Sequence, residues 1–155
     1  MQPISPSRVS ALGIAALASG FMVSEVLVGY GSAFPLVPVS VALSLAVIGI
    51  GAFSASFPIA RYRKARDAGL PAKRPNPFTA FRILLFARAA TITAAGFLGW
   101  FAGQLLWLFT IGNPVESLVL STGLNAAGSA LMLVLGFLAE LNCKAPKDHD
   151  GEVDS

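Results

Sequence analysis

The sequence has few charged side chains, and this scarcity excludes most classes of soluble protein. Only 12% of its 155 residues are charged, while 55% are hydrophobic and the mean hydropathy is +0.71. A soluble domain carries about 25% charged residues, because its surface must be polar. The composition therefore predicts an integral membrane protein with little mass outside the bilayer.

Reactive side chains are also scarce. Cys143 is the only cysteine and His149 the only histidine, which excludes an intramolecular disulfide and a cysteine-based zinc cluster. The sequence contains no phosphate-binding loop, no HExxH motif and no Ser-His-Asp set. We therefore expect a protein that is not an enzyme and that holds no metal or cofactor. The net charge of +3 does not indicate a nucleic-acid partner, because the basic residues border apolar runs.

Four apolar runs predict an all-α integral membrane four-helix bundle, with spans at residues 9–30, 39–60, 77–112 and 117–141. The third run is the most informative. Asn76 is a good N-cap, Pro77 suits the first helical position, and no charge occurs from Ala89 to Gly112. That length is sufficient to cross a bilayer core of roughly 30 Å.

The first run has an alternative interpretation as a cleaved signal peptide, because Ala16-Leu17-Ala18 resembles a cleavage site. The apolar sequence continues well past this site, which favours a retained helix.

The segments outside the runs are polar. Residues 61–76 are predicted to form a basic loop, since Gly69, Pro71 and Pro75 disfavour a helix and Pro58 allows the second helix to end or kink. Residues 142–155 form a hydrophilic acidic tail, predicted to be disordered. The predicted anchors among lipid headgroups are Arg61, Arg63, Lys64, Arg66, Lys73, Arg74 and Arg82.

The distribution of basic residues predicts the orientation. With four spans, all 11 lysines and arginines fall on one side of the membrane, and the two opposite turns contain none. Short loops rich in lysine and arginine stay in the cytoplasm. We therefore expect a multi-pass protein of the bacterial inner membrane with both termini and the basic loop in the cytoplasm.

Small residues predict where the helices touch, because helices in lipid associate through close packing. Gly96, Gly99 and Gly103 lie along one face of the third run and predict a packing seam. The other runs each offer a pair of small residues four positions apart: Gly20 and Ser24, Gly51 and Ala55, Gly123 and Ala127.

Polar residues inside the spans are the candidate site. Glu25, Gln104 and Asn125 each lie about 24 Å from the cytoplasmic end of their helix, at ~1.5 Å per residue. They form either a small protonatable site or a structural hydrogen-bond cluster. The same count places Arg88 and Glu140 at one depth near the cytoplasmic side, and this predicts an ion pair. Snorkelling of Arg88 to lipid phosphates is the alternative.

The second half of the chain resembles an uncharacterised family of small actinobacterial membrane proteins, catalogued as a domain of unknown function. The similarity lies in a Pro-aromatic-x-Ala-x-Arg motif before the third span, a glycine- and alanine-rich third span, and a Glu-x-x-Cys-x-x-Pro motif after the fourth. The matching positions are Pro77, Ala80, Arg82, Arg88, Gly96, Gly103, Glu140, Cys143 and Pro146. Lys144 is a departure, because in this family an arginine often follows the cysteine. The resemblance implies four spans and no assigned activity. It also implies that the gene often lies near folate-biosynthesis genes.

Three functions remain open. The first is a non-enzymatic accessory subunit, embedded in the lipid bilayer, that packs against another membrane protein or forms a homo-oligomer. The second is a small proton-coupled transporter that uses Glu25, similar in size and span count to the small multidrug exporters. The third is a protein that binds lipid headgroups through residues 61–76.

Overall fold

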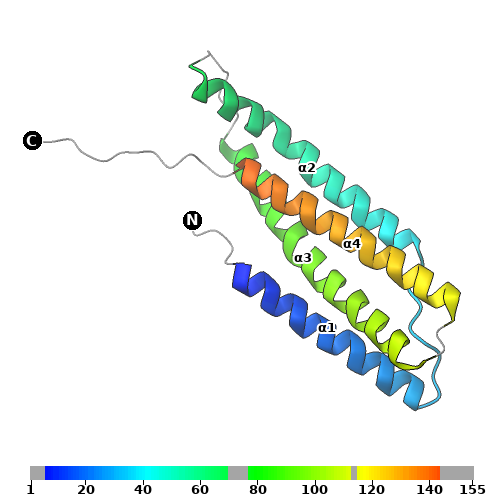
Figure 1. Ribbon diagram of the computed structural model, residues 1–155. Coiled ribbons are helices and arrows are strands. Elements are labelled where there is room, and N and C mark those ends of the chain that lie inside the picture. Colours follow the sequence, from blue (N-terminus) through cyan, green and yellow to red (C-terminus); the bar gives the residue numbers. More distant parts are fainter. Residues whose placement is uncertain (1–5, 70–76, 113–114, 144–155) are drawn as a thin grey trace, which may run out of the picture.

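The computed structural model describes residues 6–69, 77–112 and 115–143. Four helices account for nearly all of them: α1 (Pro6–Gly29), α2 (Ser40–Asp67), α3 (Pro77–Thr110) and α4 (Glu116–Cys143) (Figure 1). No strand occurs within these described ranges. Each helix is long and apolar enough to cross a membrane. The predicted all-α membrane fold is therefore confirmed.

The helices begin and end where the local sequence favours it. α3 starts at Pro77, as predicted. α1 ends in a Schellman motif, in which the Ser32 N–H bonds the Leu27 carbonyl and the Gly31 N–H bonds the Val28 carbonyl, each at 2.9 Å. Gly31 has a φ of 76°, a left-handed conformation that favours glycine. This glycine stops α1 and turns the chain towards α2.

The second helix extends beyond the predicted span, into the segment that was predicted to be a loop. α2 continues past Pro58 to Asp67, so Arg61 and Lys64 lie on a helix and not in a loop. Proline removes its own N–H donor and its ring crowds the carbonyl of residue i−4, but membrane helices tolerate it where neighbouring groups satisfy the freed backbone. The helix ends instead near Gly69, whose φ is 69°. The rest of the predicted basic loop, residues 70–76, lies outside the described residues, as does the predicted tail from residue 144.

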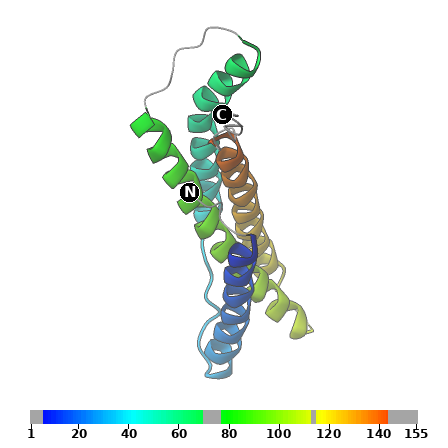
Figure 2. The same ribbon diagram turned by 90° about the vertical axis from the view of Figure 1, so that its left-hand side faces the viewer.

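α3 is the central helix, and it contacts each of the other three (Figure 1). α1 packs on one side of it and, within the described residues, touches no other helix. α4 packs on another side of α3, and α2 lies mainly against α4 with a smaller contact to α3. Figure 2 shows α3 crossing between α1 and the α2–α4 pair. α1 therefore depends on α3 alone for its position.

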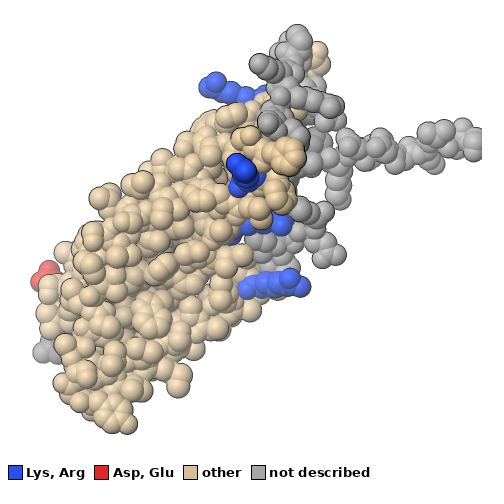
Figure 3. Space-filling view, turned by 180° about the vertical axis from the view of Figure 1, so that it is seen from behind, with Lys and Arg blue, Asp and Glu red and all other residues tan. Residues whose placement is uncertain are grey.

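The helices run in alternating directions, so the molecule has two distinct ends (Figure 1). We call the end formed by Pro6, Asp67, Pro77 and Cys143 the basic end, and the other the turn end. Lysine and arginine side chains gather at the basic end, while acidic atoms appear at the opposite one (Figure 3). The 34 residues of α3 extend about 51 Å, well beyond a bilayer core of ~30 Å.

Close backbone contact holds α1 against α3. A Cβ added at Gly99 would collide with the Gly13 carbonyl oxygen, one at Gly103 with that of Leu17, and one at Gly20 with that of Trp100. The glycine seam thus consists of Gly13, Gly20, Gly99 and Gly103. Gly96 is not part of this seam between α1 and α3, because nothing lies within 4 Å of its Cβ position. At that level α1 faces Ala95, whose carbonyl oxygen lies 3.7 Å from the Cβ position of Gly13. A contact of Gly96 with a second chain stays a prediction.

α2 and α4 also meet through glycines, but not the predicted ones. A Cβ at Gly49 would lie 2.9 Å from the Met132 Cα, and one at Gly128 would lie 2.7 Å from the Ala42 carbonyl oxygen. Gly51 and Gly123 have no neighbour within 4 Å. The sequence contains several small pairs per helix, and spacing does not show which of them faces a neighbour.

The glycine seam predicts a sharp contrast between two alanine substitutions on α3. Gly103→Ala places a methyl group against the Leu17 carbonyl oxygen and is expected to cost about 1–3 kcal/mol, the usual cost of overpacking. Gly96→Ala meets open space and is expected to change stability by less than about 1 kcal/mol. Unfolding by dodecyl sulfate in mixed micelles measures both. Equal destabilisation by the two variants would contradict the seam.

Candidate functional site

The polar side chains of the helices gather in two layers, one near each end of the molecule. The turn-end layer contains Glu25, Gln104, Trp107 and Asn125, and the basic-end layer contains Ser56, Arg88, Glu140 and Asn142. Between them the core is mainly apolar and includes the buried side chains Phe101 and Met132; the buried Ser129 hydroxyl donates to the Asn125 carbonyl oxygen of its own helix. Each layer joins helices that are far apart in sequence.

In the turn-end layer, a hydrogen bond connects α1 with α3. The Trp107 indole Nε1–H donates to Glu25 Oε2 at 2.5 Å. Phe34, from the segment between α1 and α2, stacks on the Trp107 ring with a centroid distance of 5.6 Å and an interplanar angle of 19°. Trp107 is buried and Glu25 is exposed. The arrangement ties α1, α3 and the following segment together at one point.

The amides of this layer make different contacts. Asn125, fully buried on α4, donates from Nδ2 to the Val37 carbonyl oxygen at 3.1 Å. Gln104 is 1% exposed, and its Nε2 has no hydrogen-bond partner among the described residues. The same is true of Asn125 Oδ1. Two buried polar atoms thus remain unpaired at one level of the molecule.

The predicted cluster of Glu25, Gln104 and Asn125 is therefore not joined by hydrogen bonds. Glu25 bonds Trp107, and Asn125 bonds the segment before α2. The counting of residues placed the three side chains at a common depth but could not give their direction around each helix. Because α1 does not touch α4 in the described structure, Glu25 and Asn125 belong to different interfaces.

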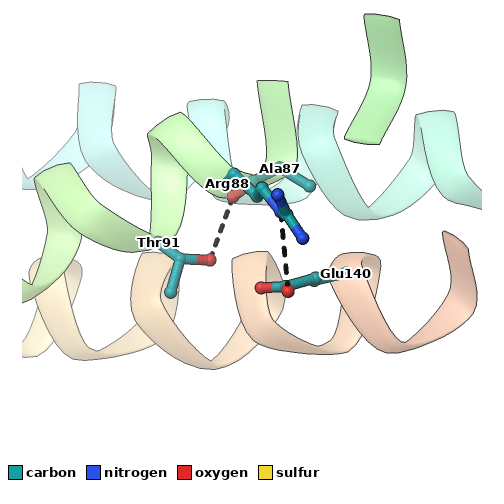
Figure 4. A network of polar contacts seen from close by, with 4 residues as sticks. All are labelled: Ala87, Arg88, Thr91 and Glu140. Carbon is teal, nitrogen blue, oxygen red and sulfur yellow. Dashed lines mark hydrogen bonds and ion pairs between the residues drawn. The ribbon is translucent and has the colours of Figure 1, made fainter. Parts of the chain in front are cut away.

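In the basic-end layer, Arg88 on α3 faces Glu140 on α4 (Figure 4). Arg88 Nε lies 3.7 Å from Glu140 Oε1, and their side chains are 23% and 5% exposed. One turn further along α3, the Thr91 hydroxyl donates to the Ala87 carbonyl oxygen at 2.9 Å (Figure 4). The ion pair therefore links α3 with α4 at the depth that the sequence suggested.

A second contact of this layer joins α4 to α2, and sequence reasoning did not find it. Asn142 Nδ2 donates to Ser56 Oγ at 3.1 Å, and the Ser56 hydroxyl donates to the Phe53 carbonyl oxygen at 2.6 Å. Serine is common in membrane helices, so its residue type alone carried no signal. The basic-end layer thus connects three helices: α2, α4 and α3.

A cavity of about 630 Å³ lies between α1, α3 and α4, along the first half of α1, the middle of α3 and the last third of α4. Its walls come from Val9 to Leu17 of α1 and from Leu133 to Glu140 of α4, and its floor from Thr91 to Ala102 of α3. It exists because α1 and α4 both pack on α3 but do not reach each other. We refer to it as the α1–α4 groove.

The predicted lipid anchors are only partly described. Arg61, Lys64 and Arg82 are exposed, in agreement with the basic surface of Figure 3. The side chains of Arg63 and Arg66, and all of Lys73 and Arg74, lie outside the described part of the structure. Within that part, no group of three histidine, cysteine or acidic residues is placed to hold a metal ion.

Comparison with known proteins places this arrangement in a family. Residues 9–147 match the family described as "Protein of unknown function (DUF3180)". The chain belongs to this family. The match covers all of α2, α3 and α4 and all but the first three residues of α1. It confirms the expected relation to an uncharacterised family. No match was found among curated proteins, and none among solved structures.

The ion pair predicts an asymmetric double-mutant cycle. Arg88→Met leaves a carboxylate that is 95% buried, so it is expected to cost about 3 kcal/mol, the lower end for breaking a buried pair. Glu140→Met should cost less, because Arg88 is partly exposed and can reach the interface. The double variant is expected to recover stability, with a coupling of about 1 kcal/mol or more. Additive costs in detergent unfolding would show that the two groups do not interact.

Proposed function

We propose that this protein is a non-enzymatic accessory subunit of the bacterial inner membrane, which packs through the outer face of α2 against another membrane protein or a second copy. The observation that carries the proposal is a set of small residues on α2 that the chain itself leaves uncovered. Their environment and spacing support helix association.

α2 has two faces suited to close packing, and one of them is already in use. Gly49 and the buried residues Leu45 and Ala52 face α4. The second face carries Ser44 and Gly51, which are exposed, and the Cβ position of Gly51 has no neighbour within 4 Å. Their seven-residue spacing places them on one line of the helix.

The lipid environment explains why small residues on this second face favour helix association. Helices in a bilayer gain little from burying apolar surface, so small residues that allow close backbone approach direct their association. The hydroxyls of Ser44 and Ser54 already donate to carbonyl oxygens of their own helix, Ser40 and Ile50. The face thus combines the small residues Ser44 and Gly51 with the exposed Val47 and Ile48, and its serine hydroxyls are already bonded within α2.

The other two functions receive less support. A proton-coupled transporter needs a carboxylate free to exchange protons during its cycle, whereas the Glu25 carboxylate accepts the Trp107 N–H and helps to hold α1 on α3. Headgroup binding by the predicted loop rests on Arg61 and Lys64, whose exposure the positive-inside rule already explains.

The proposed orientation, with the basic end in the cytoplasm, is tested by labelling single cysteines in a Cys143→Ser background. Ser32 at the turn end and Lys64 at the basic end are both exposed. In intact cells, an impermeant maleimide is expected to label Ser32→Cys at once and Lys64→Cys only after permeabilisation. The reverse pattern would place the basic end outside.

The docking face is tested by a matched pair of glycines on α2. Gly51→Leu is expected to remove the partner while thermal stability stays unchanged, because its Cβ meets open space. Gly49→Leu, two residues away, should instead destabilise the fold, since its Cβ would lie 2.9 Å from the Met132 Cα. Size-exclusion chromatography with light scattering in mild detergent measures the assembly.

The identity of the partner follows from cross-linking through Gly51→Cys in the Cys143→Ser background. A disulfide-linked homodimer would identify a second copy, and a photoactivatable maleimide at the same position would capture a different protein. Leu131→Cys, exposed on α4, serves as the control. An unchanged monomer without cross-links, in wild type as in Gly51→Leu, would refute the proposal.

A further inference from the structure

The α1–α4 groove differs from an ordinary lipid-facing surface because three helices enclose it. α1 is held against α3 by the glycine seam, and α4 is held against α3 where Gly136 meets Thr91, with the Gly136 Cβ position 2.8 Å from Thr91 Oγ1. The space between them is walled by Ile14 and Leu17 on one side and by Phe137 on the other. Small residues of α3, such as Ala102, form the floor.

The chemistry of the lining indicates an apolar occupant. Three polar side chains contribute to the groove, Ser10, Thr91 and Glu140, and each is already engaged within the chain. The Ser10 hydroxyl donates to the Ser7 carbonyl oxygen at 3.0 Å, the Thr91 hydroxyl donates to that of Ala87, and Glu140 pairs with Arg88. A polar substrate would find both hydroxyl donors and the carboxylate charge already used. A hydrocarbon chain requires none of them.

The dimensions are compatible with a hydrocarbon chain. The floor from Thr91 to Ala102 is about 16 Å long at ~1.5 Å per residue. The volume lies within the ~300–1,000 Å³ typical of small-molecule sites.

The charge at the mouth of the groove indicates the headgroup. Its polar lining lies at the basic end, where α1 begins and α4 ends. Arg8, directly before the lining residues Val9 and Ser10, is exposed, as is Arg82 on α3 at the same end. Glu140 is the acidic side chain described at this end, and Arg88 neutralises its charge. Such an excess of positive charge attracts anionic lipid headgroups.

We propose that the α1–α4 groove is a binding site for an anionic membrane phospholipid, with a hydrocarbon chain between α1 and α4 and the headgroup at the basic end. This inference requires a membrane location but is independent of packing through α2. It assigns a role to the absence of contact between α1 and α4, because the bound chain fills the space that the two helices leave.

The test places the full chain in nanodiscs of phosphatidylcholine with a trace of phosphatidylglycerol that carries a photoactivatable group on one acyl chain. After irradiation, peptide mass spectrometry locates the cross-links. We expect them to concentrate on groove residues such as Leu17, Leu98 and Phe137, and unlabelled phosphatidylglycerol should compete for them better than phosphatidylcholine. Cross-links spread evenly over all lipid-facing helices would overturn the proposal and indicate annular lipid alone.

Two matched variants of α3 test the groove itself. Ala102→Phe fills the floor and is expected to abolish the groove cross-links, whereas Ala89→Phe, exposed on α3 and outside the lining, should leave them unchanged. Comparable melting temperatures show that both variants fold, and Leu98→Trp provides a second groove-filling change. Groove cross-links that persist at full yield in a folded Ala102→Phe variant would refute the site.

Two further variants separate the parts of the proposal. Arg8→Gln is expected to reduce the preference for phosphatidylglycerol while acyl-chain cross-links remain. Gly51→Leu should leave groove labelling unchanged, so failure of the docking face and failure of the lipid site give different results. Capture of a second copy or another protein by a probe placed at Leu17 would show that a polypeptide occupies the groove, and this outcome also excludes the lipid.

Discussion

The close backbone approach of α1 to α3 is the contact on which the rest of the arrangement depends. α1 packs on no other helix in the described structure, so its position depends on α3 and on where the glycines allow close approach. Any side chain at Gly99 or Gly103 would meet a carbonyl oxygen of α1. In a bilayer, where apolar burial contributes little to association, this shape match sets the register of the two helices.

That register has consequences at both ends of α1. Towards the turn end, it brings Glu25 level with Trp107, so a carboxylate that would otherwise be costly in lipid gains an N–H donor and an aromatic neighbour. Towards the basic end, it holds α1 away from α4 and leaves the groove open. The contact between α1 and α3 thus underlies both the Glu25–Trp107 hydrogen bond and the open α1–α4 groove.

The contacts of the two polar layers connect different pairs of helices. Glu25 and Trp107 join α1 to α3, Arg88 and Glu140 join α3 to α4, and Asn142 and Ser56 join α4 to α2. Unpaired polar groups are expensive in an apolar medium, so each contact penalises slippage of one helix along another. The unpaired atoms of Gln104 and Asn125 mark a level of the described core where this satisfaction is incomplete.

The linear order of residues was sufficient to determine the four helices, the start of α3 at Pro77 and the depth of each polar residue, because these properties follow from run length and from a constant rise per residue. Which faces meet was decided only by the tertiary structure. Gly51 and Gly123 each have an alanine four positions on, yet they face open space, while Gly49 and Gly128, which have no such partner, form the contact. Likewise, depth alone grouped Glu25 with Asn125, but helix rotation placed them at different interfaces. Rotation and crossing depend on how whole surfaces fit together, and no single helix carries that information.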